Sequence, residues 1–149
     1  IQLRSGKSSY VHDPLHVRAV AFESGEGRAV ICLIDAIGIG REMSDIAKSK
    51  AAKKTGWKTE EMLICATHTH SAPKGGTGMP GREAYEKLKH DKLEEAIVLA
   101  IERLQLAKIG FSSEDEPSEV RNRRWFLEPG NMPPNPLGEK DQVKTNAGR

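Results

Sequence analysis

The chain has 149 residues, of which 30% are charged, and its formal net charge at pH 7 is +2. Positive and negative charges therefore nearly balance, which does not indicate a protein that binds nucleic acid or an anionic membrane. No apolar run approaches the roughly 18 residues needed to span a bilayer, so we expect no transmembrane segment. The length is typical of one domain or of part of one.

The first part of the chain is predicted to form two strands and a helix. Apolar residues alternate over residues 15–23, and a nearly continuous apolar run covers residues 28–37, as expected of a central strand covered on both sides. A helix is predicted over residues 41–54, because its acidic residues lie early and its lysines late, as the helix dipole favours. Gly56 follows as a candidate C-terminal cap.

The next part is predicted to alternate strand and helix again. A short apolar strand is expected over residues 62–67, followed by a glycine- and proline-rich loop over residues 71–81. Apolar residues at helical spacing predict a long helix over residues 82–106, and residues 108–112 are a candidate for one more strand. From residue 128 onward the chain is rich in Pro, Gly and Asn, which indicates an extended loop or a disordered tail.

This order of elements predicts an α/β fold, a mixed β-sheet with helices packed on it. The two cysteines, Cys32 and Cys65, each lie inside an apolar strand-like run, and no Cys-x-x-Cys spacing occurs. We therefore expect two free thiols that pack as small apolar side chains.

The sharpest candidates for a functional site are His68 and His70, which follow the strand expected over residues 62–67. In an extended segment, side chains two residues apart point to the same side. The carboxyl ends of strands are where α/β sheets bind ligands, and neutral imidazole suits zinc. The spacing alone leaves two interpretations open, a metal or catalytic site and a pair of hydrogen-bonded loop histidines.

Residues 66–76 (ATHTHSAPKGG) resemble the Thr-His-Thr-His-Ser-Gly-Pro-Gly-Gly stretch of the neutral/alkaline ceramidases and of the wider family that shares their N-terminal domain. Further matches follow in the right order over residues 11–124. They are residues 11–19 at the family's early core strand, Asp35 where the family has an aspartate closing the next strand, and Asn122-Arg123 at the Asn-Arg found after the long helix. Ala72 and Lys74 stand where the ceramidases have glycine. In this respect the sequence resembles the broader bacterial branch of the family.

The resemblance implies a zinc-dependent amide hydrolase that cleaves the N-acyl bond of a sphingolipid-like substrate. His68 would bind the catalytic zinc ion, which activates a water molecule for attack on the amide carbonyl. His70 and Arg123 would hydrogen-bond the oxygen on which negative charge develops. The family takes its remaining zinc ligands from sequence further downstream, so we predict that this chain alone binds zinc weakly and hydrolyses nothing.

By the same resemblance, residues 1–127 would be the N-terminal part of a larger catalytic domain and residues 128–149 its tail. The expected partners are an N-acylated lipid or another amide substrate, together with the remainder of the catalytic domain. Nucleic acid is not expected as a partner. A secreted or periplasmic location is implied in the same way.

Two further residues are candidates for supporting roles around the histidine pair. Asp35, at the end of a buried strand, could orient His68 or His70, although a capping or turn role is equally expected. His12, with its neighbour Asp13, could lie near the pair in space. The alternatives to a ceramidase-like enzyme are a zinc hydrolase with a different substrate and a non-catalytic domain that uses the glycine-rich loop for binding.

Overall fold

The structure of the chain is a computed structural model, which describes residues 10–73, 80–118, 124–126, 134, 137–140 and 143–145. The chain divides into two compact units, Ile1–Ala107 and Lys108–Arg149, and each is described by itself.

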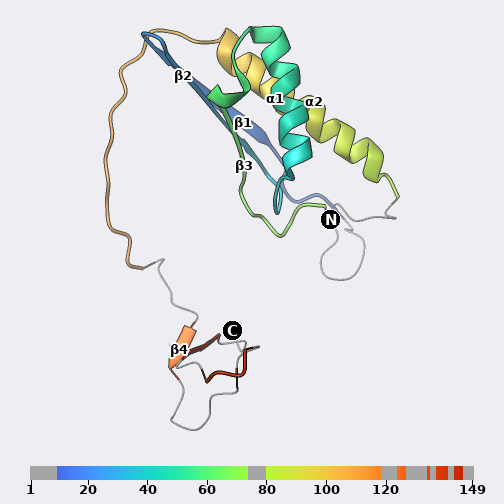
Figure 1. The fold of residues 1–149 in the computed structure, drawn as a ribbon, viewed down its shortest axis with the longest axis vertical. Coiled ribbons are helices and arrows are strands. Elements are labelled where there is room, and N and C mark those ends of the chain that lie inside the picture. The colour runs from blue at the N-terminus through green and yellow to red at the C-terminus, as the bar shows by residue number, and fades with distance from the viewer. Residues whose placement is uncertain are drawn as a thin grey trace. The chain divides into compact units, whose positions relative to one another are not determined.

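The first unit is a three-stranded mixed sheet with two helices (Figure 1). Strand order is β1-β2-β3, with β1 antiparallel and β3 parallel to the central strand β2. The α/β fold expected from the sequence is therefore confirmed. The elements in chain order are β1 (Val17–Ser24), β2 (Gly27–Ile34), α1 (Arg41–Thr55), a 3-10 turn η1 (Thr59–Glu61), β3 (Met62–Ala66) and α2 (Arg82–Glu102).

The hairpin between β1 and β2 fixes the register of the sheet. Ser24 pairs with Gly27 across a two-residue turn, in which Gly25 has a φ of 58°. Glycine adopts this left-handed conformation without steric cost, and turns of this kind match the twist of the strands they join. From that turn the pairing runs without a break to Val17 opposite Ile34.

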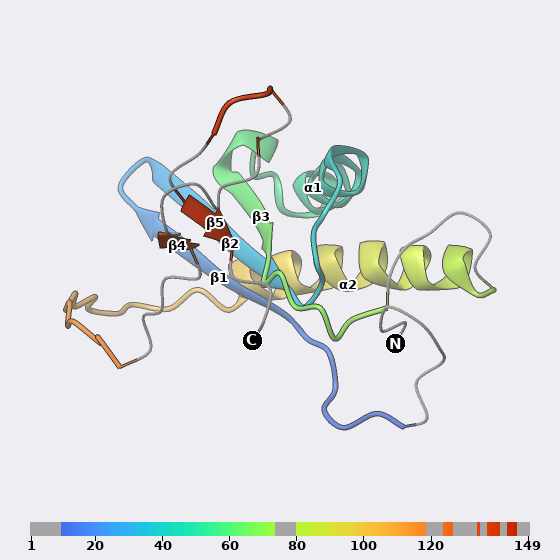
Figure 2. The same ribbon diagram turned by 90° about the horizontal axis from the view of Figure 1, so that it is seen from below.

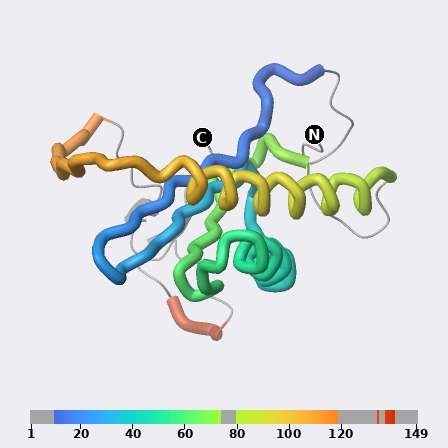
Figure 3. Tube along the Cα trace, turned by 90° about the horizontal axis from the view of Figure 1, so that it is seen from above, coloured from blue at the N-terminus to red at the C-terminus, as the bar shows by residue number. Residues whose placement is uncertain are grey.

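Both helices lie on the same side of the sheet, and α2 runs across β1 and β2 (Figures 2 and 3). The core is formed where the inner face of the sheet meets these helices. Gly56 caps α1 with a φ of 74°, and its N–H donates to the carbonyl of Ala52, as the sequence predicts. The most deeply buried core residues are Val30 and Cys32 of β2, Ala47 and Ala51 of α1, and Leu93 and Ile97 of α2.

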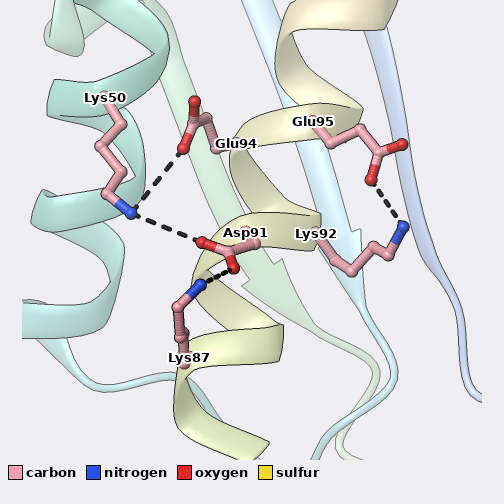
Figure 4. Close-up of polar contacts among 6 residues, drawn as sticks. All are labelled: Lys50, Lys87, Asp91, Lys92, Glu94 and Glu95. Carbon is pink, nitrogen blue, oxygen red and sulfur yellow. Dashed lines mark hydrogen bonds and ion pairs between the residues drawn. The ribbon is translucent and has the colours of Figure 1, made fainter. Parts of the chain in front are cut away.

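Ion pairs also join the two helices (Figure 4). The Lys50 ammonium of α1 lies 3.6 Å from the Asp91 carboxylate and 3.8 Å from the Glu94 carboxylate of α2. Lys54, one turn further along α1, lies 2.6 Å from the other oxygen of Glu94. The lysines late in α1 are therefore partly engaged with α2.

The largest differences between the predicted elements and the structure concern two element ends and one whole strand, whereas the other predicted ends lie within two residues of those observed. The central strand ends at Ile34, three residues earlier than expected, and α2 ends at Glu102 instead of residue 106. The prediction of a strand over residues 108–112 was wrong, since this segment forms no strand. Its apolar residues Ile109 and Phe111 are exposed, and a strand gains stability only when it pairs with a neighbour.

The second unit contains a short antiparallel pair, β4 (Arg124–Phe126) and β5 (Val143–Thr145), together with an isolated bridge between Pro134 and Lys140. Part of the segment expected to be an extended loop or tail therefore forms a strand. The predicted domain boundary between residues 127 and 128 lies outside the described residues.

Two expectations concern the chain as a whole. No helix in the described part of the chain is both long and apolar enough to cross a membrane. Cys32 is buried, Cys65 is half-buried, and both are free thiols, as the sequence predicts.

Candidate functional site

The candidate site lies at the edge of the sheet where β2 and β3 end and β1 begins. Because β2 and β3 are parallel, their carboxyl ends meet at this edge. Two backbone hydrogen bonds extend the sheet by one row beyond its strands. The Asp35 N–H donates to the carbonyl of His16 at 2.9 Å, and the Thr67 N–H donates to the carbonyl of Ile34 at 3.0 Å.

The Asp35 carboxylate of β2's carboxyl end also contacts the beginning of β1. Its Oδ2 accepts a 2.9 Å hydrogen bond from the backbone N–H of His16, and the Arg18 guanidinium lies 3.5 Å away. The His16 hydrogen bond, the Arg18 charge and the Thr67 hydroxyl hold the pKa of this carboxyl below its usual value, against an opposing effect of burial. The Nδ1 atom of the His16 ring also lies 3.7 Å from Oδ2. Among the described residues, neither ring of the His68–His70 pair is a partner of Asp35.

His68 does not continue the strand in the extended form on which the same-side argument depended. The strand β3 ends at Ala66, and His68 has a φ of 58°, the one positive φ among the described residues other than glycine. The left-handed conformation is uncommon outside glycine, although histidine tolerates it better than most residues. Such residues cluster at functional sites, where the surrounding structure holds them in place.

The His68 ring is held by a contact with the loop that follows β2. Its Nδ1 lies 2.7 Å from the carbonyl oxygen of Ile37. A carbonyl oxygen only accepts, so Nδ1 carries the hydrogen in this contact. In the neutral ring Nε2 is then unprotonated, with its lone pair available to a metal ion or to a proton donor. This is the arrangement that metal-binding histidines commonly adopt, with the other ring nitrogen donating to a backbone carbonyl.

The turn at His68 brings its ring against that of His70. The two ring centroids lie 5.1 Å apart, and the ring planes cross at 78°, an edge-to-face contact. Both residues are exposed, so solvent and ligands can reach them. Ala72, two residues further on, is buried. The two rings therefore lie together, but not through the extended backbone from which the sequence argument placed them on one side.

No contact between the histidine pair and the other predicted site residues occurs among the described residues. His12 is exposed and its Nδ1 lies 3.0 Å from the carboxylate of its neighbour Asp13. Arg123 lies outside the described residues.

Zinc sites in proteins need three or four ligands. Within the described ranges, no group of three or more His, Cys, Asp or Glu side chains gathers where it could hold a metal ion. His68 has the donor chemistry of a zinc ligand, but the described residues do not complete a coordination shell around it.

Sequence reasoning missed two features of this edge. The carbonyl of Ile37 was not a candidate, because residues 28–37 were expected to continue as a strand and its carbonyl to pair within the sheet. Arg18 was also missed. Its side chain lies beside Asp35 because β1 and β2 pair in antiparallel register, a relationship between segments that an individual strand pattern does not reveal.

No protein-family model matches the chain, and no curated protein or solved structure matches it significantly.

Proposed function

We propose that this chain supplies part of the active site of a zinc-dependent amide hydrolase that resembles neutral ceramidase and cleaves the N-acyl bond of a sphingolipid-like substrate. The observation that supports the proposal best is the 2.7 Å contact between His68 Nδ1 and the Ile37 carbonyl. This contact fixes the tautomer that leaves Nε2 free to bind a metal ion. His68 is also exposed, so a ligand can reach the residue from solvent.

In the proposed site His68 would hold the zinc ion through Nε2. When bound, zinc supplies Lewis-acid activation of a water molecule for attack on an amide carbonyl. His70 lies in edge contact with the His68 ring and donates a hydrogen bond to the substrate oxygen as negative charge develops on it. Arg123 serves the same oxygen, in the role that the family resemblance gives it.

The residues that complete the zinc site are not among the described residues of this chain. One imidazole binds zinc weakly, and a second imidazole beside it adds at most one more ligand. The proposal therefore assigns the remaining ligands to the rest of the catalytic domain. For the chain alone it predicts weak zinc binding and no hydrolysis.

The first experiment measures zinc binding to the 149-residue chain. The titration is followed through the ¹⁵N resonances of the imidazole rings. In the wild type, zinc should shift the Nε2 resonance of His68. In His68→Ala, the resonances of the remaining imidazole rings should show no saturable shift. His90→Ala is the matched control, since this histidine lies on α2, away from the pair in the chain. Equal zinc binding by the wild type and His68→Ala would remove the basis of the proposal.

The second experiment uses the longest gene product that contains this chain. The proposal expects about one zinc per chain and release of fatty acid from an N-acylsphingosine. His68→Ala should lose both, whereas His70→Ala should keep zinc and lose turnover. Zinc without turnover of N-acylsphingosine would contradict the ceramidase assignment and favour an amide substrate of another class.

A further inference from the structure

His68 is held in place on two sides, by residues that lie next to Asp35 in the chain. The ring of His68 contacts the carbonyl oxygen of Ile37, two residues after Asp35. The backbone before His68 is held through Thr67, whose N–H donates to the carbonyl of Ile34, the residue before Asp35. The position of the imidazole therefore depends on the part of the chain where β2 ends.

Asp35 fixes this part of the chain to the beginning of β1. Its backbone N–H donates to the carbonyl of His16, and its Oδ2 accepts a hydrogen bond from the His16 N–H, both at 2.9 Å. The Arg18 guanidinium lies 3.5 Å from the same oxygen, and the Asp35 side chain is only 19% exposed. Hydrogen bonds to an ionised carboxylate are roughly twice as strong as neutral ones. Asp35 therefore restrains the end of β2 through its backbone and its side chain together.

The Asp35 carboxylate also interacts with the residue directly before His68. The Thr67 hydroxyl is among the hydrogen-bond donors that lower the pKa of this carboxyl. Thr67 is thus held through its side chain as well as through its N–H. His68 follows immediately, with a φ of 58°, and a residue other than glycine keeps such a conformation only where the surrounding structure fixes it.

We propose that Asp35 is the positioning residue for His68, and that it acts through Thr67 and the end of β2 instead of through a contact with the ring. Among the described residues, its carboxylate contacts neither His68 nor His70. Its effect is to hold the backbone of His68 and the Ile37 carbonyl in register, so that the ring keeps its hydrogen on Nδ1. The inference rests on the proposed function in that His68 is taken as the metal-binding residue.

The test measures the tautomer of the His68 ring in the metal-free chain, through long-range ¹H–¹⁵N correlation spectra of the imidazoles. The wild type should show one form, with the hydrogen on Nδ1. Asp35→Ala should lose this single form and show exchange between the two tautomers, because the Ile37 carbonyl and the His68 backbone are no longer fixed. Asp35→Asn keeps an oxygen that can accept from the His16 N–H and the Thr67 hydroxyl, so it should retain most of the wild-type signal.

Three further variants separate positioning from stability. Thr67→Val removes the hydroxyl of an exposed residue and keeps the shape of its side chain, so it should weaken the Nδ1–H signal while the chain stays folded. Thr67→Ser, which keeps a hydroxyl, is its matched control. Trp57→Leu destabilises the core at the opposite end of β2, where the Trp57 ring lies beside Arg28, and it should leave the His68 signal unchanged.

An unchanged His68 signal in Asp35→Ala or in Thr67→Val overturns the proposal, and so does an equal loss of signal in Trp57→Leu. If Asp35→Ala does not fold, the comparison of Thr67→Val with Thr67→Ser decides. Zinc does not enter these measurements, so the zinc titration tests the proposed function separately. A wild type that binds no zinc, together with the expected His68 signals, would contradict the proposed function and still support the positioning role of Asp35.

Discussion

Nδ1 of His68 lies 2.7 Å from the carbonyl oxygen of Ile37, a contact that joins the exit of β3 to the exit of β2. His68 has the left-handed backbone conformation, and its ring lies against that of His70. The two strand exits therefore act together, since one places the imidazole and the other fixes which of its nitrogens carries the hydrogen.

The first prediction concerns that tautomer. When the His68 ring is uncharged, it should be the Nδ1–H tautomer, because the carbonyl of Ile37 accepts a hydrogen bond and cannot donate one. Long-range ¹H–¹⁵N correlation spectra of the imidazole rings distinguish the two tautomers directly. A His68 ring found as the Nε2–H form would mean that the contact does not exist in solution and that Nε2 is not free for a metal ion.

This contact also marks the limit of what sequence reasoning could reach. The strands, the helices and the mixed sheet follow from apolar periodicity, and the C-terminal cap at Gly56 from the glycine that ends α1. Those features depend on residues close together in the sequence. The pairing of His68 with Ile37 depends on where β2 ends, and the predicted strand ran three residues too far.

The histidine pair itself was predicted on a premise that the structure does not support. Residues two apart face the same side only in extended backbone, and His68 is not extended. The rings meet because a left-handed residue turns the chain. The failed strand over residues 108–112 has a related cause, since a strand pattern cannot state whether a neighbouring strand is present to pair with it.

The second prediction concerns Asp35 and acid stability. Its pKa is lowered by the hydrogen bond from the His16 N–H, and by Arg18 and Thr67, so the charged carboxyl stabilises the folded state. That contribution is complete above the ordinary aspartate pKa and is lost as the pH falls through the lower pKa of the folded protein. Asp35→Ala should cost about 1–2 kcal/mol of unfolding free energy at pH 7.

Urea unfolding of both proteins at pH 7 and near pH 3 measures this effect. The gap between wild type and Asp35→Ala should narrow at the lower pH, since protonation removes the same interactions that the substitution removes. Asp13→Ala is the control, because Asp13 is exposed and pairs with its own neighbour His12. An equal gap at both pH values would show that the charge of Asp35 is not what stabilises the row.

The third prediction concerns the two thiols. Burial, with a smaller effect of nearby Cys65, raises the pKa of the Cys32 thiol to about 12. The reactive species is the thiolate, so Cys32 should resist alkylation by iodoacetamide at pH 8 in the folded chain. Cys65 is half-buried and should be alkylated first. Peptide mass spectrometry after timed exposure assigns each site, and in urea both should react at similar rates.

The fourth prediction concerns the packing of α2. Leu93 is fully buried between the sheet and α1, whereas Leu88 of the same helix is half exposed. Leu93→Ala removes buried methyl groups and leaves a cavity, so it should lower the unfolding free energy by about 3 kcal/mol. Leu88→Ala makes the same chemical change and should cost less than about 0.5 kcal/mol. Similar costs for both would mean that α2 does not pack on the sheet through Leu93.

The last prediction concerns the ion pairs that Glu94 of α2 makes with Lys50 and Lys54 of α1, of which Figure 4 shows the pair with Lys50. Glu94 is buried, and its carboxylate lies 2.6 Å from the Lys54 ammonium, whereas Glu95 is exposed and pairs with Lys92 of its own helix. Glu94→Ala should therefore lower the unfolding free energy by about 1–2 kcal/mol, between the values for exposed and buried pairs. Glu95→Ala, the matched control, should cost less than about 0.5 kcal/mol.

Salt and alkaline pH test whether charge is the cause. At about 1 M salt the cost of Glu94→Ala should fall, because screening weakens pairs whose lysines face the solvent. Glu94 also raises the pKa of Lys54, so the contribution of the pair is complete below the ordinary lysine pKa and is lost as the pH rises through the higher pKa of the folded protein. A cost that does not change with salt or with pH would instead assign the role of Glu94 to packing of its methylene groups against α1.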